Sequence, residues 1–136
     1  MDDVSDAAAP ATMHIGELAD RAEMSQRTIR HYDEVGLLVP SGRTTGGFRV
    51  YTDRDLERLL VIRRMKPLGF SLEEMAELLR VVDALADAGP ADTATLAERL
   101  DGWLAEARTR HAALVERAGM AEEFLGTLTS LRASLP

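Results

Sequence analysis

The segment from residue 25 to residue 51 restricts the fold of this chain more than any other part of it. It reads SQRTIRHYDEVGLLVPSGRTTGGFRVY. Its first half is typical of a short helix that begins after the capping hydroxyl of Ser25, carries Arg27 and Arg30, and ends at Gly36. Its second half places two glycines between short runs that each contain an arginine, which is typical of a β-hairpin. A basic helix followed by a basic hairpin favours a helix for the major groove of DNA with a wing beside it.

Hydrophobic spacing predicts a further short helix before this segment. Four apolar residues fall on one of its faces, namely Ile15, Leu18, Ala19 and Ala22. The second helix then covers residues 26–35, and about three residues join the two helices. So short a connection is typical of a helix-turn-helix unit.

Two more helices are predicted after the hairpin. Thr52 can cap a third helix that begins at Asp53 and ends near Pro67, which lacks the N–H that a helix interior needs. The sequence Ser71-Leu72-Glu73-Glu74 is a complete capping box, and it predicts a fourth helix over residues 72–82.

We therefore expect five consecutive parts in a mainly α fold with a small β-hairpin wing. They are a flexible tail (1–12), a winged helix-turn-helix domain (13–82), a linker (83–91), a dimerisation helix (92–118) and a short C-terminal helical segment or tail (119–136). The long helix is expected to break after Ala118, because Gly102, Gly119 and Gly126 each weaken it by about 1 kcal/mol relative to alanine.

The long helix carries an apolar stripe that has no partner in its own chain. Its residues are spaced by alternating fours and threes and include Leu96, Leu100, Trp103, Ala107 and Leu114. Arg110 and Arg117 also fall on inward positions, so the stripe is imperfect. The simplest partner is the same helix of a second subunit, which predicts a twofold homodimer.

Charge and composition restrict the function further. The net charge is −7, yet residues 21–66 contain ten basic and six acidic side chains, so the excess acid lies away from the predicted DNA-binding part. The absence of cysteine excludes disulfides and thiolate metal sites, and His14, His31 and His111 are scattered without ligand spacing. No run of apolar residues is long enough for a membrane span, so we expect a cytoplasmic protein without a membrane partner.

Catalytic chemistry is not indicated either. The sequence offers no nucleophile with a nearby base, no phosphate-binding loop and no carboxylate pair on a suitable scaffold. We therefore expect neither an enzyme nor a cofactor.

Five short motifs stand between residues 13 and 82. They are IGELA (15–19), SQRTIRHYDEVGLL (25–38), GFRVY (47–51), DLERL (55–59) and LGFSLEE (68–74). In order and spacing they resemble the motifs of the MerR family of transcriptional regulators. The chain is similar to a member that lacks both a large effector domain and the cysteines of the metal-sensing and redox-sensing branches.

The resemblance implies a homodimer that is held by an antiparallel coiled coil and carries one winged helix-turn-helix per subunit. It implies that the dimer sits on a pseudopalindromic site in double-stranded promoter DNA, between promoter elements whose spacing is too long. Bending and untwisting the DNA would then realign these elements for RNA polymerase, so the polymerase would be an indirect partner. Such a protein is associated with the nucleoid when it is bound.

Carried over position by position, the resemblance assigns DNA contacts to ten residues. Base and phosphate contacts at the start of the recognition helix fall to Ser25, Gln26, Arg27, Thr28 and Arg30. Further contacts, mainly to the DNA backbone, fall to His31, Tyr32, Arg43, Arg49 and Lys66. His31 and Phe48 stand where most members have tyrosine, so a hydroxyl donor is changed or lost there. Tyr32 is suited to core packing as well as to a phosphate contact. Lys66 can either complement the dipole at the end of a helix or contact a DNA phosphate from a second wing.

Three alternatives stay open at this point. The apolar residues Trp103, Met120, Phe124 and Leu128 either line a pocket for an unidentified small-molecule effector or simply pack the helix. The chain could instead be an architectural, excisionase-like protein that bends DNA without acting on transcription. It could also be a helical protein-interaction adaptor that has lost DNA binding, for which the net acidity is the one favourable feature.

Overall fold

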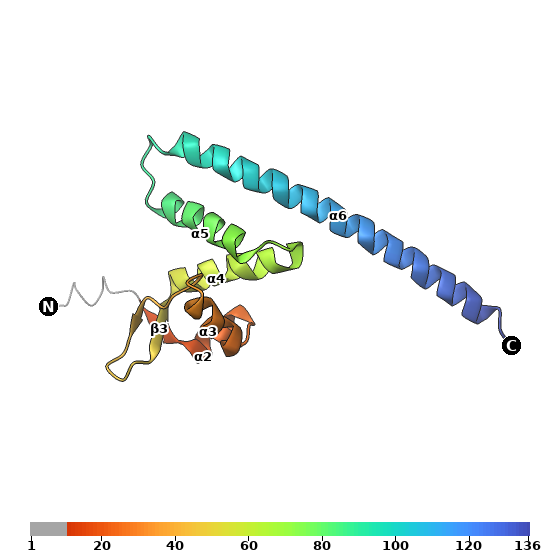
Figure 1. Cartoon of the computed structure of the whole chain (residues 1–136), viewed down its shortest axis with the longest axis horizontal. Coiled ribbons are helices and arrows are strands. Elements are labelled where there is room, and N and C mark those ends of the chain that lie inside the picture. Colours follow the sequence, from red (N-terminus) through yellow and green to blue (C-terminus); the bar gives the residue numbers. More distant parts are fainter. Residues whose placement is uncertain (1–10) are drawn as a thin grey trace. The chain divides into compact units, whose positions relative to one another are not determined.

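The computed structural model describes residues 11–136, which divide after Ala86 into two compact units. The first unit combines short helices with a small sheet, and the second contains one long helix (Figure 1). A mainly helical fold with a small sheet was predicted, and this is confirmed. Most of the expected flexible tail, residues 1–10, lies outside the described residues.

The helix-turn-helix consists of α2 (Ile15–Ala22) and α3 (Gln26–Glu34). Ser25 caps α3 as predicted, because its Oγ accepts a hydrogen bond of 3.1 Å from the backbone N–H of Thr28. Gly36 follows α3 with a φ of +77°, and the N–H of Leu37 then donates to the carbonyl of Tyr32 at 2.8 Å. This left-handed turn ends the helix and folds the chain back onto the core.

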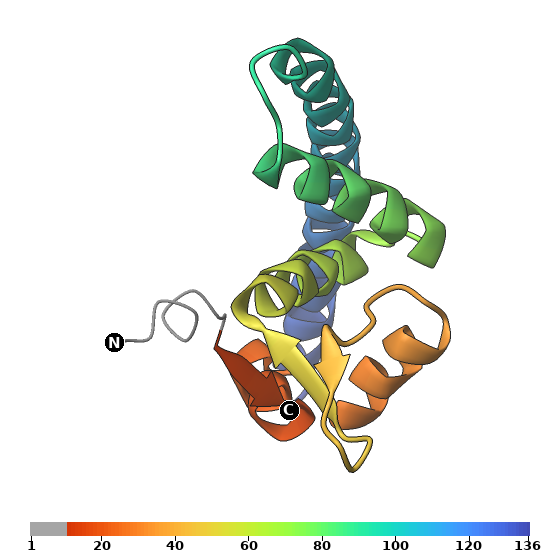
Figure 2. The same cartoon turned by 90° about the vertical axis from the view of Figure 1, so that its left-hand side faces the viewer.

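The sheet has three antiparallel strands in the order β1 (Thr12–His14), β3 (Arg49–Thr52) and β2 (Gly42–Arg43), and Figure 2 shows β3 between the other two. The hairpin of β2 and β3 was predicted, with Gly47 at a φ of +84° in its turn. Strand β1 was not predicted, and placing residue 12 in the tail was wrong. The three residues of β1 are too few to show an alternating pattern, and Thr12 pairs with Thr52, far along the chain.

Helix α4 (Asp53–Met65) begins with a full capping box. Asp55 accepts from the backbone N–H of Thr52 at 2.9 Å, and the backbone N–H of Asp55 donates to the Thr52 hydroxyl at 3.3 Å. The helix changes at its end to a 3₁₀ turn, η1 (Lys66–Leu68), which contains Pro67. The predicted end near Pro67 is therefore correct.

Helix α5 (Leu72–Ala86) starts at the predicted capping box, in which Ser71 and Glu74 exchange hydrogen bonds. It continues four residues beyond the predicted end at Val82, so the first part of the expected linker is helical. In this extension the carboxylate of Asp83 is paired with Arg54 at 3.5 Å and Arg58 at 3.3 Å. These partners on α4 stabilise the last turn, and their effect is not visible in local sequence.

The core of the first unit is apolar and is shared by the helices and the central strand. Its fully buried side chains include Leu18, Ile29, Leu38, Tyr51, Leu59, Ile62 and Leu79. They come from α2, α3, the turn after it, β3, α4 and α5. This common core fixes the recognition helix and the hairpin to one another.

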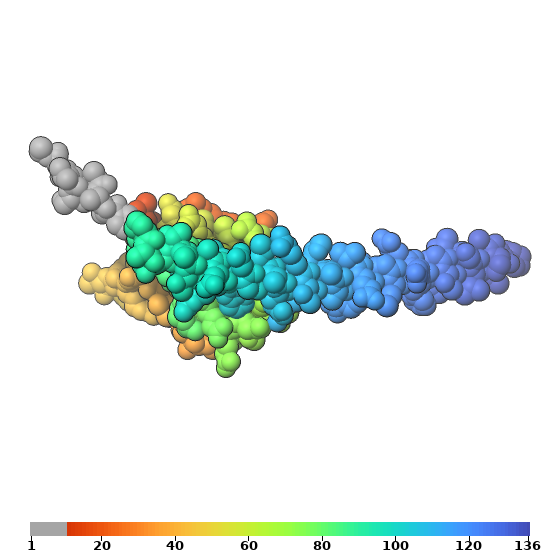
Figure 3. All heavy atoms as spheres, turned by 90° about the horizontal axis from the view of Figure 1, so that it is seen from above, coloured from red at the N-terminus to blue at the C-terminus, as the bar shows by residue number. Residues whose placement is uncertain are grey.

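The second unit contains α6 (Thr93–Ala133), a single helix of 41 residues that is about 60 Å long at 1.5 Å per residue. Figure 3 shows its outer part as a continuous rod coloured from cyan to blue. The predicted break after Ala118, and with it a separate segment 119–136, was wrong. Glycine weakens a helix but keeps its backbone N–H, and no proline occurs between Pro90 and Pro136 to remove one. Exposed pairs such as Arg110 with Glu106, at 3.1 Å, support the helix locally.

Candidate nucleic-acid interface

The N-terminal half of α3 presents polar side chains to the surface. Gln26, Arg27 and Arg30 are exposed, and Arg30 donates to Gln26 Oε1 at 3.4 Å, one turn away. The hydroxyls of Ser25 and Thr28 are 2.8 Å apart and occupied with the cap. The N-terminus of a helix attracts anions through its free N–H groups and its dipole. Two arginines beside such a terminus form a suitable surface for phosphates and for guanine edges.

The next turn of α3 divides between surface and core. His31 is exposed, and its Nδ1 is 4.0 Å from Glu34 Oε2. Tyr32 is 3% exposed, so its ring belongs to the core of the unit. Core packing was one of the two roles expected for Tyr32, and the structure gives it that role.

The wing brings two arginines to one acid of the recognition helix. Arg43 on β2 and Arg49 on β3 are paired residues in the sheet register. Both reach the same oxygen of Asp33 on α3, Arg49 through Nε at 2.8 Å and Arg43 through Nη2 at 3.2 Å. The hydrogen bond to Asp33 is the main reason why the pKa of Arg49 is raised.

Asp33 was missed by the sequence analysis. It was counted only as one of the acids between residues 21 and 66, because its partners lie ten and sixteen residues further along the chain. The only available signal was the predicted hairpin, which brings Arg43 and Arg49 onto neighbouring strands.

The turn of the wing presents an aromatic side chain. Phe48 is 70% exposed, whereas most aromatic residues of the described chain are buried or partly buried. Its ring lies against Gly46, where an added Cβ would come within 3.3 Å of the ring. Phe48 therefore offers an apolar surface, and no hydroxyl, at the position where a phosphate donor is usual in the resembled family.

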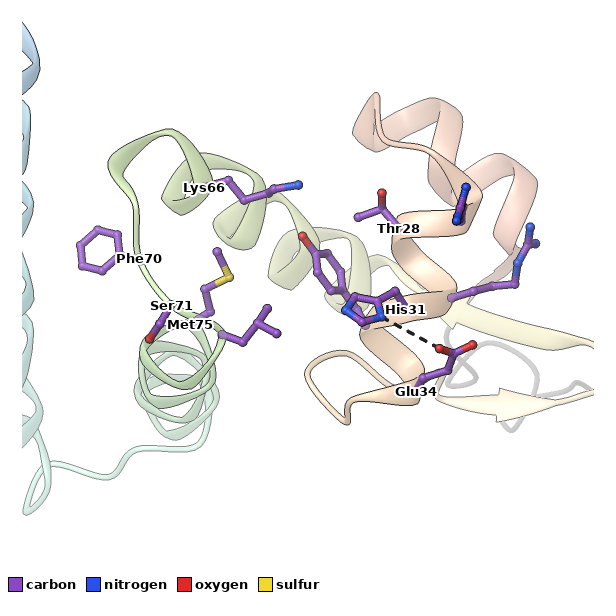
Figure 4. Close-up of a pocket in the computed structure, with 11 residues that line it drawn as sticks. Thr28, His31, Glu34, Lys66, Phe70, Ser71 and Met75 are labelled. Atoms are coloured by element: carbon purple, nitrogen blue, oxygen red, sulfur yellow. Dashed lines mark ion pairs between the residues drawn. The ribbon is translucent and has the colours of Figure 1, made fainter.

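A groove of about 870 Å³ runs between α3 and the start of α5. Its lining includes Arg27, Thr28, Arg30, His31, Glu34, Lys66, Ser71 and Met75. In Figure 4, Lys66 extends from η1, directly after α4, toward Thr28, and Met75 faces the groove from α5. The structure thus brings Lys66 and the recognition helix together around one concave surface. Arg63, a second basic side chain near the end of α4, does not line this groove and is paired with Glu23 at 3.2 Å.

The residues that were assigned to dimerisation all lie on α6, where their spacing gives them a common face. Leu96 is only 6% exposed in a single chain, and Leu100, Trp103, Ala107 and Leu114 are partly buried. The expectation that this stripe has no partner in its own chain was therefore wrong for Leu96. Many large apolar side chains of this helix are exposed, including Leu104, Val115, Met120, Phe124, Leu125, Leu128 and Leu131. A helix with so much exposed apolar surface favours a partner.

The proposed effector residues do not form a pocket within one chain. Trp103 and Leu128 are 25 positions apart on the continuous helix α6, which corresponds to about 37 Å. Met120, Phe124 and Leu128 are each between 46% and 62% exposed. A single cavity that contains all four residues would therefore have to combine residues of two chains.

Two further searches concern residues 11–136 only. Within this range no group of three His, Asp or Glu side chains is arranged to hold a metal ion. None of the helices in the same range combines the length and the apolar character that crossing a membrane requires.

A helix-turn-helix that shares its core with a basic hairpin defines the winged helix-turn-helix class of proteins. The sequence matches the family described as MerR HTH family regulatory protein over residues 13–81, and the family described as MerR, DNA binding over residues 56–120. The chain therefore belongs to the MerR family of helix-turn-helix regulatory proteins.

Curated relatives match this chain over about half of its length. The HTH-type transcriptional regulator ZntR of Escherichia coli K12 is 51% identical over 67 residues, which are 49% of this chain and 48% of the relative. The mercuric resistance operon regulatory protein of Bacillus cereus is 46% identical over 69 residues, which are 51% of this chain and 52% of the relative. The chain thus matches these relatives over about half of their length.

Solved structures match over most of the chain. A MerR family transcriptional regulator from Bacillus cereus aligns with a TM-score of 0.63 and 27% identity, covering 88% of this chain and 79% of the other. HiNmlR, a MerR family regulator that lacks the sensor domain and was solved on promoter DNA, aligns with a TM-score of 0.68 and 23% identity, covering 91% and 95%. Because HiNmlR is only 23% identical to this chain, the similarity to it concerns the fold alone.

Proposed function

We propose that the protein is a sequence-specific transcriptional regulator that binds a pseudopalindromic promoter site as a homodimer and distorts the DNA there. The observation that carries this proposal is the arrangement of the first unit. Exposed Arg27 and Arg30 open the recognition helix, and the hairpin places Arg43 and Arg49 beside the same helix. A major-groove helix and a backbone-contacting wing need this combination.

The distribution of charge supports DNA as the partner. Residues 21–66 carry ten basic and six acidic side chains, an excess of four positive charges, in a chain whose net charge is −7. Arginines that neutralise phosphates release counterions from DNA, and this release supplies much of the binding free energy. The acidic remainder of the chain disfavours contact with DNA outside this surface.

The dimer is proposed from α6. Leu100, Trp103, Ala107 and Leu114 share one face of that helix with Leu96, which is already buried within one chain. A second copy packed antiparallel would cover the part of this face that is still accessible. Two DNA-binding units then reach two half-sites. Deforming a short duplex costs a few kcal/mol, which phosphate contacts from two subunits can offset. The deformation would realign promoter elements for RNA polymerase, and the protein would act in the cytoplasm, at the nucleoid.

A small-molecule effector is part of the proposal only as a site between two copies. Met120, Phe124 and Leu128 expose apolar surface on α6, and a second chain would close this surface into a cavity. The residues favour an apolar ligand.

The function is tested by measuring binding to labelled DNA from the region upstream of the protein's own gene, at two salt concentrations. Arg27→Ala should weaken specific binding by roughly tenfold or more, since one good base contact contributes about 1–3 kcal/mol. Arg108→Ala on α6 removes the same charge from another exposed position and should leave the affinity nearly unchanged. Equal binding by the Arg27 variant and the unmodified protein would contradict the assignment.

A further inference from the structure

A single carboxylate joins the recognition helix to both strands of the wing. Oδ2 of Asp33 on α3 accepts from Arg49 on β3 at 2.8 Å and from Arg43 on β2 at 3.2 Å. The two arginines are directly paired across the hairpin, so their positive charges are close to one another. Without the carboxylate between them, they would repel each other and separate.

Burial distinguishes Asp33 from an ordinary surface acid. Its side chain is 13% exposed, whereas the side chain of the next residue, Glu34, is 71% exposed and lies 4.0 Å from the exposed His31. A shielded ion pair is less weakened by salt and water than an exposed one. The Asp33 contact is therefore suited to fixing geometry.

The contacts leave donors available for DNA. Arg49 uses Nε for Asp33, and within residues 11–136 neither of its Nη groups has a hydrogen-bond partner. Arg43 uses Nη2 for Asp33, and its Nη1 is 3.5 Å from the carbonyl oxygen of Gly47 in the hairpin turn. The three side chains together carry one net positive charge, and Asp33 determines the direction in which the guanidinium groups point.

We propose that Asp33 is a positioning residue for DNA binding, which holds Arg43 and Arg49 of the wing in the orientation that contacts the phosphate backbone. This inference rests on the proposed function and deepens it. It leads to an unusual expectation. Removing an acid from a DNA-binding surface normally strengthens binding, because repulsion of the phosphates decreases. Removing the charge of Asp33 should weaken binding instead.

The test compares two isosteric substitutions on neighbouring positions, Asp33→Asn and Glu34→Gln, in the full chain. Binding to the upstream DNA is measured by fluorescence anisotropy over a series of salt concentrations. Asp33→Asn should lower the affinity by roughly three- to tenfold, the effect of one hydrogen bond of ordinary strength. Glu34→Gln should leave the affinity unchanged or raise it.

The salt dependence separates positioning from a loss of folding. If the wing arginines lose their phosphate contacts, the slope of log affinity against log salt should fall by up to about two, since each contact contributes about 0.9. A variant that is only partly folded would bind with a lower active fraction and an unchanged slope. An unchanged slope for Asp33→Asn, or an affinity as high as that of Glu34→Gln, would overturn the proposal.

Two further measurements keep the proposal testable if Asp33→Asn folds poorly. In the Arg49→Gln background, Asp33→Asn should have a smaller effect on DNA affinity than it has alone, because the two residues act together. In the unmodified protein, the Nε–H of Arg49 should exchange with water more slowly than that of Arg27. Equal exchange rates or fully additive effects would contradict the proposal.

Failure of this inference differs from failure of the proposed function. If the unmodified protein binds no upstream DNA at low salt, the function is wrong. If it binds, but Asp33→Asn binds as well as Glu34→Gln, only the role of Asp33 is wrong.

Discussion

Tyr51 occupies an unusual position for a polar side chain. It is fully buried in β3, and its hydroxyl has no hydrogen-bond partner within residues 11–136. Burial raises the pKa of Tyr51 above its usual value of 10.0, while nearby Arg49 acts in the opposite direction. A buried hydroxyl without a partner costs about 1–3 kcal/mol. The aromatic ring therefore stabilises the core, and the hydroxyl does not.

Tyr51→Phe should keep or raise the free energy of unfolding at pH 7, by up to about 1 kcal/mol. The pKa of Tyr51 is raised in the folded state, so the folded protein holds this proton more tightly than the unfolded chain does. Its contribution to stability is complete below pH 10 and is lost as the pH rises through the folded pKa. Urea unfolding between pH 7 and pH 11 should show a smaller alkaline loss for the Phe variant.

Tyr32→Phe is the matched control, because Tyr51 remains in that variant and the alkaline loss should persist. A Tyr51→Phe variant that is clearly less stable at pH 7 would show that the hydroxyl has a partner.

Sequence analysis predicted the roles of residues whose partners are close in the chain, and it missed the roles of residues whose partners are far away in the chain. Ser25 and Thr52 were assigned as caps because a cap bonds to an N–H three residues away, which is visible in sequence. Asp33 has no local signal, since its role depends on a hairpin folding back over α3. Residues whose partners are remote in the chain could not be found without the fold.

The limits of helices and strands could likewise be predicted where local signals mark them, and not where they depend on remote contacts. The limits of α3 and α4 were predicted to within one or two residues because caps, a glycine and a proline mark them. Strand β1 and the last turn of α5 were missed, since each depends on contacts with a distant element. In α6 the propensity of glycine was given too much weight, although glycine alone does not end a helix.

The continuity of α6 leads to a prediction that is checked by two measurements, the thermal midpoint and the helical signal. Replacing Gly102, Gly119 and Gly126 by alanine should raise the thermal midpoint, since each change contributes about 0.5–1 kcal/mol to helix stability. Apart from the chain neighbours and the backbone of α6 itself, no atom of residues 11–136 lies within 4 Å of an added Cβ at any of these positions, so no clash opposes the change.

Circular dichroism distinguishes a continuous helix from a broken one in this experiment. The helical signal at low temperature should be the same before and after the three substitutions, because these positions are already helical. A clear gain of helical signal would mean that the unmodified helix is interrupted.

At the scale of the whole molecule, the first unit and α6 carry different tasks in the proposed function. The first unit holds the proposed DNA-binding residues around its own core, and α6 holds many of the large exposed apolar residues. The family and the fold could be predicted from motifs in residues 13–82, because those motifs combine caps, turns and core positions. The partner of α6 could only be inferred from its unsatisfied apolar surface.

The combined variant Leu100→Glu, Leu114→Glu should dissociate the proposed dimer. Both residues are on the predicted dimer face, and burying a carboxylate without a partner is strongly unfavourable. Sedimentation should give the mass of one chain, 14.9 kDa, for the variant, and about twice that mass for the unmodified protein. Arg108→Glu on the same helix is the control and should remain dimeric. A variant that sediments like the unmodified protein would show that the dimer face lies elsewhere.

The shortness of α3 limits how much sequence one copy of the protein can read. Its nine residues extend about 14 Å, which is the height of about four stacked base pairs. Any given combination of four base pairs recurs by chance about once in 256 positions, far too often to specify one locus among the ~10⁶ or more sites of a genome. In the proposed function, selection of a single promoter therefore needs at least two such readings at a fixed separation, which the proposed dimer would supply together with the contacts of its wings.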